Sequence, residues 1–409
     1  MSQRTSELEE AVCRAIALRH DAMVNDLAEY VAIPTGKGHT PGLDALRERV
    51  VERLTSLGAS VSLEPGEPKP AWLEGPGGVQ RNAAAGRADP PPVVVARRSG
   101  GSGPRVLIAG HLDTVFEPDG AFQTMTAQDD GEHASGPGVV DMKGGVVLAL
   151  HALECLAEAG VDLNWTVLLN SDEETGSFTS EAVLRRVAAE HDFGIAVEPA
   201  LPDGGLAIER MGSGQFCVDV FGRSAHAGRE FEKGVSAVTK LGEMLVELSQ
   251  LVDLERGKIV NVGPLLGGPV TNAVPDYAAC WGNVRYRDPA AGDELAEQID
   301  ALATADDAMP RVVVHRRWNR PAKPETDAVR RFAELTRDAA ESLGQTMPFA
   351  RTGGVCDGNI LQDAGLATLD TLGVRGGNLH RTDEFIELSS LVERAQLLAV
   401  VLSRLASQR

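Results

Sequence analysis

The sequence predicts an α/β protein with a second, α+β module inserted between two parts of its larger domain. From residue 106 onward, short apolar strands alternate with helices, which indicates a parallel sheet covered on both faces. After Pro202 the order changes to strand-strand-helix-strand-strand-helix and a final strand, which is typical of a compact α+β module. The length of 409 residues also favours more than one domain, at roughly 150 residues each.

The first hundred residues give weaker signals. Helical periodicity extends over residues 8–31 and stops before Pro34, which predicts a helical hairpin or one long helix. Residues 65–105 are rich in Gly, Pro, Ala and Arg, and within them only 93–96 has the pattern of a strand. The part before residue 93 is therefore expected to be a loop or a mobile surface excursion.

The alternating region places polar side chains at strand ends. Its predicted strands are 106–109, 165–170 and 194–197, and its predicted helices are 144–159 and 179–189. Functional groups in such sheets collect at the carboxyl ends of the strands. Four candidates lie there: His111, Glu173, Glu174 and Glu198.

The inserted module is expected to span residues 207–317, between domain parts 1–206 and 318–409. Its predicted strands are 207–209, 215–221, 258–262, 278–286 and 312–315, and its predicted helices are 234–251 and 292–303. Helices at 327–343 and 389–407 then return the chain to the larger domain.

Composition excludes several classes of partner. A formal charge of -20 argues against nucleic acid and against anionic membrane surfaces, because both would repel the chain. The five cysteines are scattered without a C-x-x-C pair, so they are expected to be reduced core thiols. Acidic residues Glu7, Glu9 and Glu10 stand where a signal peptide would need an apolar stretch, which predicts a cytoplasmic protein.

The adjacent carboxylates Glu173 and Glu174 are the most informative feature for function. They follow the apolar run 165–169, and adjacent residues of a strand point to opposite faces, so the two cannot play the same part. One carboxylate that holds a metal ion beside one that moves protons is the arrangement of a metallohydrolase.

Four further residues are candidate metal ligands. His111 ends a strand and is followed by Asp113, which is placed to orient the ring, although a polar strand-end loop is the commoner case. Asp141 lies on a Gly-rich turn where it would repel phosphate, so it suits a metal or serves as a helix cap. Taken singly, Glu198 and His380 have the pattern of ordinary surface residues. Together with Glu174 they make two histidines and three carboxylates, a set that two zinc ions share in dinuclear hydrolases.

These motifs resemble the M20 metallopeptidase family, and in particular its glutamate carboxypeptidase branch. The matching runs are G-H-L-D-T-V (110–115), G-P-G-V-V-D-M-K-G-G (136–145), S-D-E-E-T-G-S (171–177), V-E-P (197–199), S-A-H-A-G (224–228) and H-x-x-x-E (380–384). The resemblance implies a zinc-peptidase-type mixed sheet flanked by helices, with an inserted lid or dimerisation domain and a homodimer.

The resemblance also assigns roles around the metals. It implies two Zn²⁺ ions per chain, with Co²⁺ or Mn²⁺ as substitutes, and Asp141 as the bridging ligand before a cis peptide bond. The remaining ligands would be His111 and Glu198 on one ion and Glu174 and His380 on the other. Glu173 would be the general base, and Asp113 would orient His111.

For the substrate, the resemblance implies a small molecule with a free carboxylate. His226 of the module would stabilise the oxyanion, and Asn272 and Arg285 would bind the carboxylate. Gly354 offers a backbone N–H, but Val355 and Cys356 replace the Gly-Thr of the glutamate carboxypeptidases, which puts the preference for glutamate in question.

The function implied is hydrolysis of a peptide or N-acyl amide bond next to a free carboxylate. The alternative is an N-acyl-amino-acid deacylase of the aminoacylase, acetylornithine deacetylase or succinyl-diaminopimelate desuccinylase type. A metal-dependent binding protein without catalysis is the alternative from another class, and retention of Glu173 beside Glu174 argues against it.

Overall fold

The larger unit of the protein is built on a six-stranded sheet. The computed structural model describes residues 5–77, 90–101 and 103–408. The strand order is β1-β2-β6-β3-β7-β14, and β2 runs antiparallel to both of its neighbours, so the sheet is mixed. Its strands are β1 (Ser60–Glu64), β2 (Val93–Arg98), β3 (Arg105–His111), β6 (Asn164–Asn170), β7 (Phe193–Ala196) and β14 (Thr368–Leu369).

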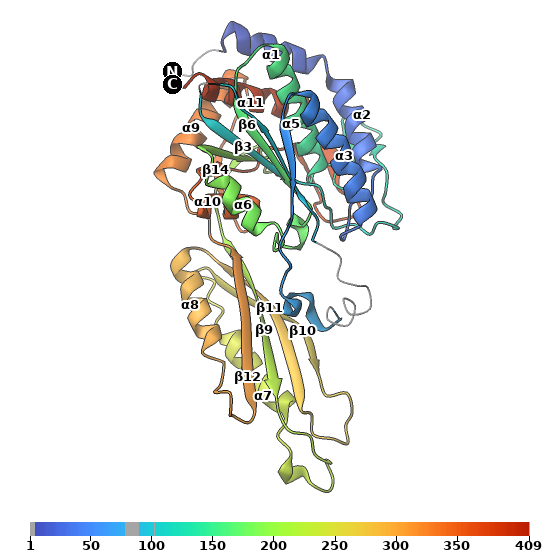
Figure 1. Cartoon of the computed structure of the whole chain (residues 1–409), viewed down its shortest axis with the longest axis vertical. Coiled ribbons are helices and arrows are strands. Elements are labelled where there is room, and N and C mark those ends of the chain that lie inside the picture. The colour runs from blue at the N-terminus through green and yellow to red at the C-terminus, as the bar shows by residue number, and fades with distance from the viewer. Residues whose placement is uncertain (1–4, 78–89, 102, 409) are drawn as a thin grey trace.

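Helices cover both faces of this sheet because successive strand residues point to opposite sides (Figure 1). Val94 and Ala96 of β2 belong to one core, and Val93 and Val95 belong to the other. The first core is covered by α1 (Glu7–Ala17), α2 (His20–Val31), α3 (Thr40–Ser56), α5 (Lys143–Glu158), α9 (Asp327–Ser342) and α11 (Ser389–Ala406). The second core is covered by α6 (Glu181–Ala188) and α10 (Asp357–Asp363).

The N-terminal prediction is confirmed as a pair of helices, α1 and α2. The strand predicted at 93–96 is β2. Sequence reasoning assigned no element to α3 or β1, although Leu43, Leu46, Val50 and Leu54 of α3 have helical spacing and are buried. Of the excursion predicted before β2, residues 71–77 form the 3-10 helix η1 (Ala71–Gly77), and 78–89 lie outside the described residues.

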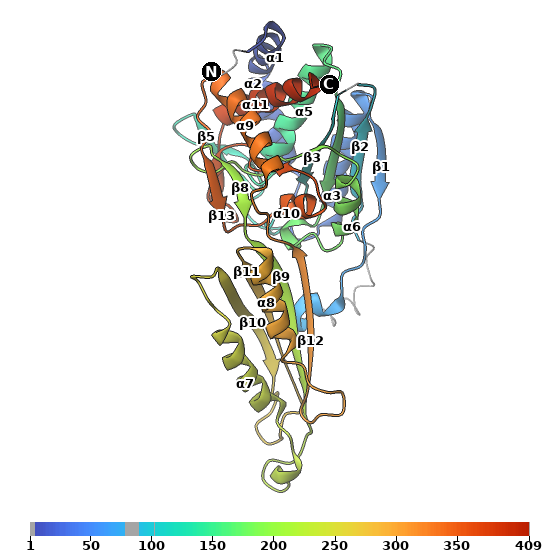
Figure 2. The same cartoon turned by 90° about the vertical axis from the view of Figure 1, so that its left-hand side faces the viewer.

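The inserted module is a four-stranded antiparallel sheet in the order β10-β11-β9-β12, with two helices on one face (Figure 2). Its elements are β9 (Gly212–Phe221), η3 (Phe231–Lys233), α7 (Ala237–Gln250), β10 (Lys258–Gly267), β11 (Tyr277–Tyr286), α8 (Pro289–Asp300) and β12 (Arg311–Arg320). The strand predicted at 207–209 is present as β8 (Leu206–Arg210), but it pairs with β13 (Phe349–Thr352) and so lies outside the module's sheet. The division at residues 207 and 317 stays a prediction.

A further small sheet has the order β15-β16-β5-β4, and the loop between β15 and β16 carries the candidate ligand His380. Its strands are β4 (Thr126–Ala127), β5 (His133–Ser135), β15 (Gly376–Gly377) and β16 (Phe385–Glu387). The five cysteines are free, and four of them are buried, which agrees with the expected core thiols. Among the described residues, no helix is both long enough and apolar enough to cross a lipid bilayer.

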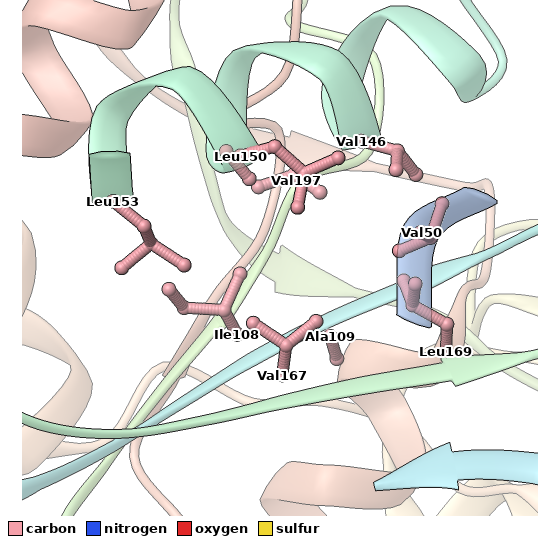
Figure 3. A pocket seen from close by; sticks show the side chains of 10 residues that line it. Val50, Ile108, Ala109, Val146, Leu150, Leu153, Val167, Leu169 and Val197 are labelled. Atoms are coloured by element: carbon pink, nitrogen blue, oxygen red, sulfur yellow. The ribbon is translucent and has the colours of Figure 1, made fainter. Parts of the chain in front are cut away.

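A small cavity of about 10 Å³ lies between α5 and the central sheet (Figure 3). A volume of that size holds at most a single water molecule, and the lining offers no side-chain polar group to bind one. The lining consists of Val50, Ile108, Ala109, Val146, Ala149, Leu150, Leu153, Val167, Leu169 and Val197. The cavity is therefore a packing defect of the core and not a ligand site.

Candidate metal centre

The carboxyl ends of the parallel strands bring the predicted ligands together. His111 is the last residue of β3, and Glu198 follows β7 by two residues. Glu173 and Glu174 follow β6 and begin the 3-10 helix η2 (Glu173–Thr175). Neighbouring parallel strands end at one edge of a sheet, so side chains that are far apart in the sequence converge there.

The five predicted ligands form two groups that share one carboxylate. In the first group, His111 Nε2 lies 3.2 Å from Asp141 Oδ1 and 3.9 Å from Glu198 Oε2. In the second, His380 Nε2 lies 3.4 Å from Asp141 Oδ2 and 3.2 Å from Glu174 Oε2. The ligand atoms of each group lie within 4.8 Å of one another. Asp141 thus offers a different oxygen to each group, which is the geometry of a bridging carboxylate.

Two features fix the turn that presents Asp141: hydrogen bonds to Glu384 and the backbone conformation of Gly138. Glu384, fully buried, accepts hydrogen bonds from the backbone N–H groups of Val140 at 3.0 Å and Asp141 at 3.2 Å. Gly138 has a φ of 73°, and a Cβ there would lie 2.8 Å from Thr114 Cγ2, so only glycine is accommodated. The Asp141–Met142 peptide bond is cis, as the resemblance implied.

Asp113 contacts both His111 and the following carboxylate pair. The Nδ1 atom of His111 lies 3.0 Å from the backbone oxygen of Asp113 and 3.5 Å from its carboxylate. That carboxylate accepts hydrogen bonds from the backbone N–H groups of Glu173 at 3.2 Å and Glu174 at 3.0 Å. Asp113 therefore fixes the ring of His111 and the position of the glutamate pair at the same time.

Glu173 is buried beside the two ligand groups without belonging to either. Burial raises the pKa of Glu173 above its usual range, although the nearby Arg320 guanidinium acts in the opposite direction. Arg320 Nη2 lies 2.6 Å from Glu173 Oε1 and also donates to the Glu173 backbone oxygen at 2.7 Å and to Ser177 Oγ at 2.8 Å. A carboxylate in such surroundings is suited to accept and release a proton.

Sequence reasoning missed Arg320. It ends the last strand of the module directly before Pro321, and an arginine at a strand end in an acidic chain was the available signal. Strand pairing places Arg320 close to the larger unit, because it is in register with Ser213 at the end of β9 nearest that unit.

The charges of the pocket show that it favours a cation. Burial raises the pKa of Glu174 and of Glu198. Hydrogen bonds to Asp141 and Glu174 raise the pKa of His380 to about 10, against the effect of burial. Buried carboxylates are costly without compensating positive charge, which protonated imidazoles and Arg320 supply here. Two histidines and three carboxylates are also the donor set that zinc accepts, so these residues suit the predicted ions.

Arg285 also lies near the pocket, on strand β11, which β9 separates from the strand of Arg320. It pairs in register with Ser213, which pairs in turn with Arg320, so the two arginines flank one residue of β9. Burial and the neighbouring Arg320 charge lower the pKa of Arg285. Its Nη1 atom is buried and has no hydrogen-bond partner among the described residues. An unpartnered guanidinium nitrogen at this place is suited to an anionic ligand.

His226 and Asn272 are placed at the opposite end of the module. Both side chains are exposed, and the two segments are joined by a hydrogen bond from Ala227 N–H to the Asn272 backbone oxygen at 3.0 Å. They lie beyond Phe221, which is eight residues along β9 from Ser213, about 26 Å in an extended strand. Among the described residues, neither forms a hydrogen bond or ion pair with the ligand groups.

Gly354 lies in the exposed loop between β13 and α10. Its N–H donates to Thr352 Oγ1 at 3.3 Å, and its carbonyl oxygen accepts from Arg210 Nη1 at 3.1 Å. Arg210 in turn is paired with the buried Asp370 at 2.8 Å. Arg210 therefore holds the loop in place, while the role of Gly354 in substrate binding stays a prediction.

Two ligand groups that share a carboxylate, with a buried glutamate beside them, are the arrangement of a dinuclear metallohydrolase. The chain belongs to the peptidase family M20/M25/M40, whose family model matches residues 107–404. The family resemblance and the mixed α/β fold predicted from the sequence are therefore confirmed, and the chain is an enzyme of the metallopeptidase or amidohydrolase type.

The chain is similar to several characterised members of the family. It is 27% identical to carboxypeptidase G2 from Pseudomonas sp. over 386 residues, which cover 92% of this chain and 88% of that protein. It is also 27% identical to succinyl-diaminopimelate desuccinylase from Methylorubrum populi, over 75% of this chain and 84% of that protein. The fold matches the M20 family metallo-carboxypeptidase Sso-CP2 from Sulfolobus solfataricus with a TM-score of 0.71 at 16% identity, covering 94% and 99% of the two chains.

Proposed function

We propose that this protein is a dinuclear metallohydrolase that cleaves a peptide or N-acyl amide bond next to a free carboxylate. The observation that carries the proposal is the convergence of the two ligand groups and the buried Glu173 at one edge of the larger unit's sheet, close to the Nη1 atom of Arg285, which has no hydrogen-bond partner among the described residues. The similarity to carboxypeptidase G2 along most of the chain supports the same function.

In this proposal His111 and Glu198 hold one zinc ion, Glu174 and His380 hold the other, and Asp141 bridges them. Zinc supplies positive charge, lowers the pKa of a bound water to about 7 and polarises the scissile carbonyl. Glu173 takes a proton from the attacking water and returns it to the leaving nitrogen. Arg285 binds the substrate's carboxylate and so positions the bond for attack.

The alternative within the same class is an N-acyl-amino-acid deacylase, which uses the same catalytic groups. The similarity to succinyl-diaminopimelate desuccinylase supports this alternative. A panel of peptidyl and N-acyl amino acids, followed by release of free amine, separates the two, because each predicts a different preferred acyl group. Loss of all turnover with a chelator and its return with Zn²⁺, Co²⁺ or Mn²⁺ is expected. Turnover that persists in a metal-free enzyme would contradict the proposal.

Arg285→Ala is expected to raise KM for a free-acid substrate by at least about tenfold, with a smaller decrease in kcat, because it removes positioning more than chemistry. Arg285→Lys should restore little, since an ammonium group lacks the planar fork that matches a carboxylate. Steady-state kinetics on a free acid and on its amide measures the effect, and the amide should be the poorer substrate for the parent enzyme.

Arg287→Ala is the matched control for this experiment. Arg287 lies two residues further along, and its side chain is half exposed and paired with Asp288 at 3.6 Å. Its loss should leave KM unchanged. An unchanged KM in Arg285→Ala, or equal hydrolysis of acid and amide, would remove the carboxylate-binding role.

The module is proposed to form a homodimer. Strand β10 is an edge strand of the sheet, and exposed apolar side chains gather on it and on the adjacent helix α7. These are Val238 and Val246 of α7, Ile259, Leu265 and Leu266 of β10, and Val270. An exposed apolar edge pairs readily with another copy. A monomeric mass by sedimentation at micromolar concentration would contradict the dimer.

In a dimer, His226 and Asn272 can act at the metal centre of the partner chain. Rotation of the module about its junction with the larger unit keeps their distance from that junction, which is greater than the roughly 26 Å from Ser213 to Phe221, while the ligand groups lie close to it. Closure of a single chain therefore does not bring them to the ligands, and we infer that they act at the centre of the partner chain. Hybrid dimers of His226→Ala chains and Glu173→Gln chains should then recover part of the activity that each variant lacks.

The cytoplasmic location remains part of the proposal. It is supported by the five free thiols, because disulfides are rare in reducing compartments. Recovery of the protein in a periplasmic or secreted fraction of its native cells would contradict this location.

A further inference from the structure

The connection between β1 and β2 is far longer than a hairpin loop needs to be. It covers residues 65–92, whereas such loops commonly have about two to five residues. The connection leaves and returns at one place: a Cβ at Gly66 would lie 3.0 Å from both Pro90 Cβ and the Thr179 backbone oxygen. Glu67 N–H also donates to the Thr179 oxygen at 2.7 Å. Residues 65–77, called the strap below, are thus anchored on the larger unit at the start of α6.

The middle of the strap contacts the sheet of the inserted module. The indole N–H of Trp281 donates to the Trp72 backbone oxygen at 2.6 Å. The Trp72 ring stacks on His315, with centroids 6.0 Å apart and an interplanar angle of 17°. Further along, a Cβ at Gly75 would lie 3.9 Å from Pro264 Cγ. The strap therefore reaches strands β12, β11 and β10, none of which belongs to the sheet on which it is anchored.

The strap covers the face of the module's sheet that α7 and α8 leave open (Figure 2). Trp281, Cys217 and His315 are paired in register across β11, β9 and β12. Their neighbours Phe216 and Cys280 belong to the core under the helices, so this row points to the other face. Cys217, in the middle of the row, is nevertheless only 1% exposed, whereas Trp281 and His315 on either side of it are partly exposed.

The polar side chains beneath the strap fix the ring on which Trp72 lies. Asp219 Oδ2 is 3.3 Å from His315 Nε2, and Asp219 Oδ1 accepts a hydrogen bond from Tyr277 Oη at 2.7 Å. Stacked rings and a satisfied indole N–H make a specific contact that a loop resting at random would not make.

The position of this contact matters for motion of the module. The chain crosses between the units next to Met211 and Pro321, and Asn359 Nδ2 donates to both backbone oxygens at 2.9 Å and 2.7 Å. The strap contacts the row of Cys217, four residues beyond Ser213 and about 13 Å further along β9. A contact at that distance from the junction resists rotation far more than a contact at the junction itself.

We propose that the strap fixes the orientation of the inserted module relative to the larger unit by docking Trp72 on the open face of the module's sheet. Release of Trp72 frees the module to rotate about the crossings at Met211 and Pro321. This conformational role requires neither bound metal nor hydrolysis, so it stands or fails independently of the proposed function.

The first experiment measures how well the strap covers Cys217. Labelling by a thiol reagent, located by mass spectrometry, is compared between the parent chain, Trp72→Ala and the milder Trp281→Phe, which keeps an aromatic ring but removes the indole N–H donor and part of the ring. Trp72→Ala should speed labelling of Cys217 at least about tenfold, with a smaller increase in Trp281→Phe. Cys280 lies on the helix-covered face of the same sheet and should keep its rate. Ala71→Ser, an exposed strap position, is the matched control.

The second experiment measures the orientation of the module. Spin labels at Glu48→Cys of α3 and Glu297→Cys of α8, both exposed, report the distance between the units in a Cys13→Ser, Cys217→Ser background diluted with unlabelled chain. A single narrow distance distribution is expected, and Trp72→Ala should broaden it. Faster labelling of Cys217 with an unchanged distribution would show that the strap docks without restraining the module, and would overturn the proposal. No change in either measurement would overturn it as well.

Discussion

Glu173→Gln is expected to abolish turnover while the metal content of the chain stays unchanged. Glutamine keeps an oxygen for the Arg320 hydrogen bond, so the local structure should be retained, but it cannot accept a proton at neutral pH. Loss of a general base commonly costs two to four orders of magnitude in kcat, about 3 to 5 kcal/mol in the barrier. Steady-state kinetics and elemental analysis of the purified variant give the two values.

Glu174→Gln is the comparison variant for metal content. Glu174 belongs to a ligand group with Asp141 and His380, and Glu173 does not, so only Glu174→Gln should lower the metal content. Near-normal activity of Glu173→Gln, or equal metal loss in the two variants, would reject the assignment of roles within the pair.

Asp141→Ala is expected to lose both metal ions, since its two oxygens lie in two different ligand groups. Removal of this carboxylate also leaves two neighbouring cations without the negative charge between them, and their mutual repulsion is strong at such a separation. His111→Ala removes a neutral ligand from one group only, and should weaken chiefly one site. Elemental analysis gives the metal content, and circular dichroism establishes that each variant is folded.

Asp119→Ala, at an exposed position of the loop after β3, is the matched control and should retain both ions. Two ions per chain persisting in Asp141→Ala would exclude the bridging role. Loss of both ions in His111→Ala would instead show that the two sites are filled only together.

Much of the candidate site could be predicted from the sequence because its residues lie at predictable places. Strands end where apolar runs end, so the positions of His111 and Glu198 followed from the pattern alone. The adjacency of Glu173 and Glu174 is a local property that no folding step alters. The turn carrying Asp141 was recognisable from its glycines, although its second support, Glu384, comes from a distant segment.

The prediction failed where the answer depended on pairing between distant segments. Residues 207–209 have the pattern of a strand, but the pattern does not say which partner the strand will have, and β8 pairs with β13. The resemblance also assigned His226 and Arg285 to one site. The register of β9 and β11 places them at opposite ends of the module's sheet within one chain, so this assignment stays a prediction that depends on a second chain.

The sequence by itself thus determined the class of fold and the identity of the candidate ligands, because periodicity and strand ends are local properties of the chain. Only the tertiary structure decided that Arg320 meets Glu173, that Trp72 lies on the module's sheet, and that one nitrogen of Arg285 has no partner among the described residues. The two contacts join residues that are more than a hundred positions apart in the chain. Their proximity is set by strand register and by how the two units pack together, and neither is encoded in any short stretch of sequence.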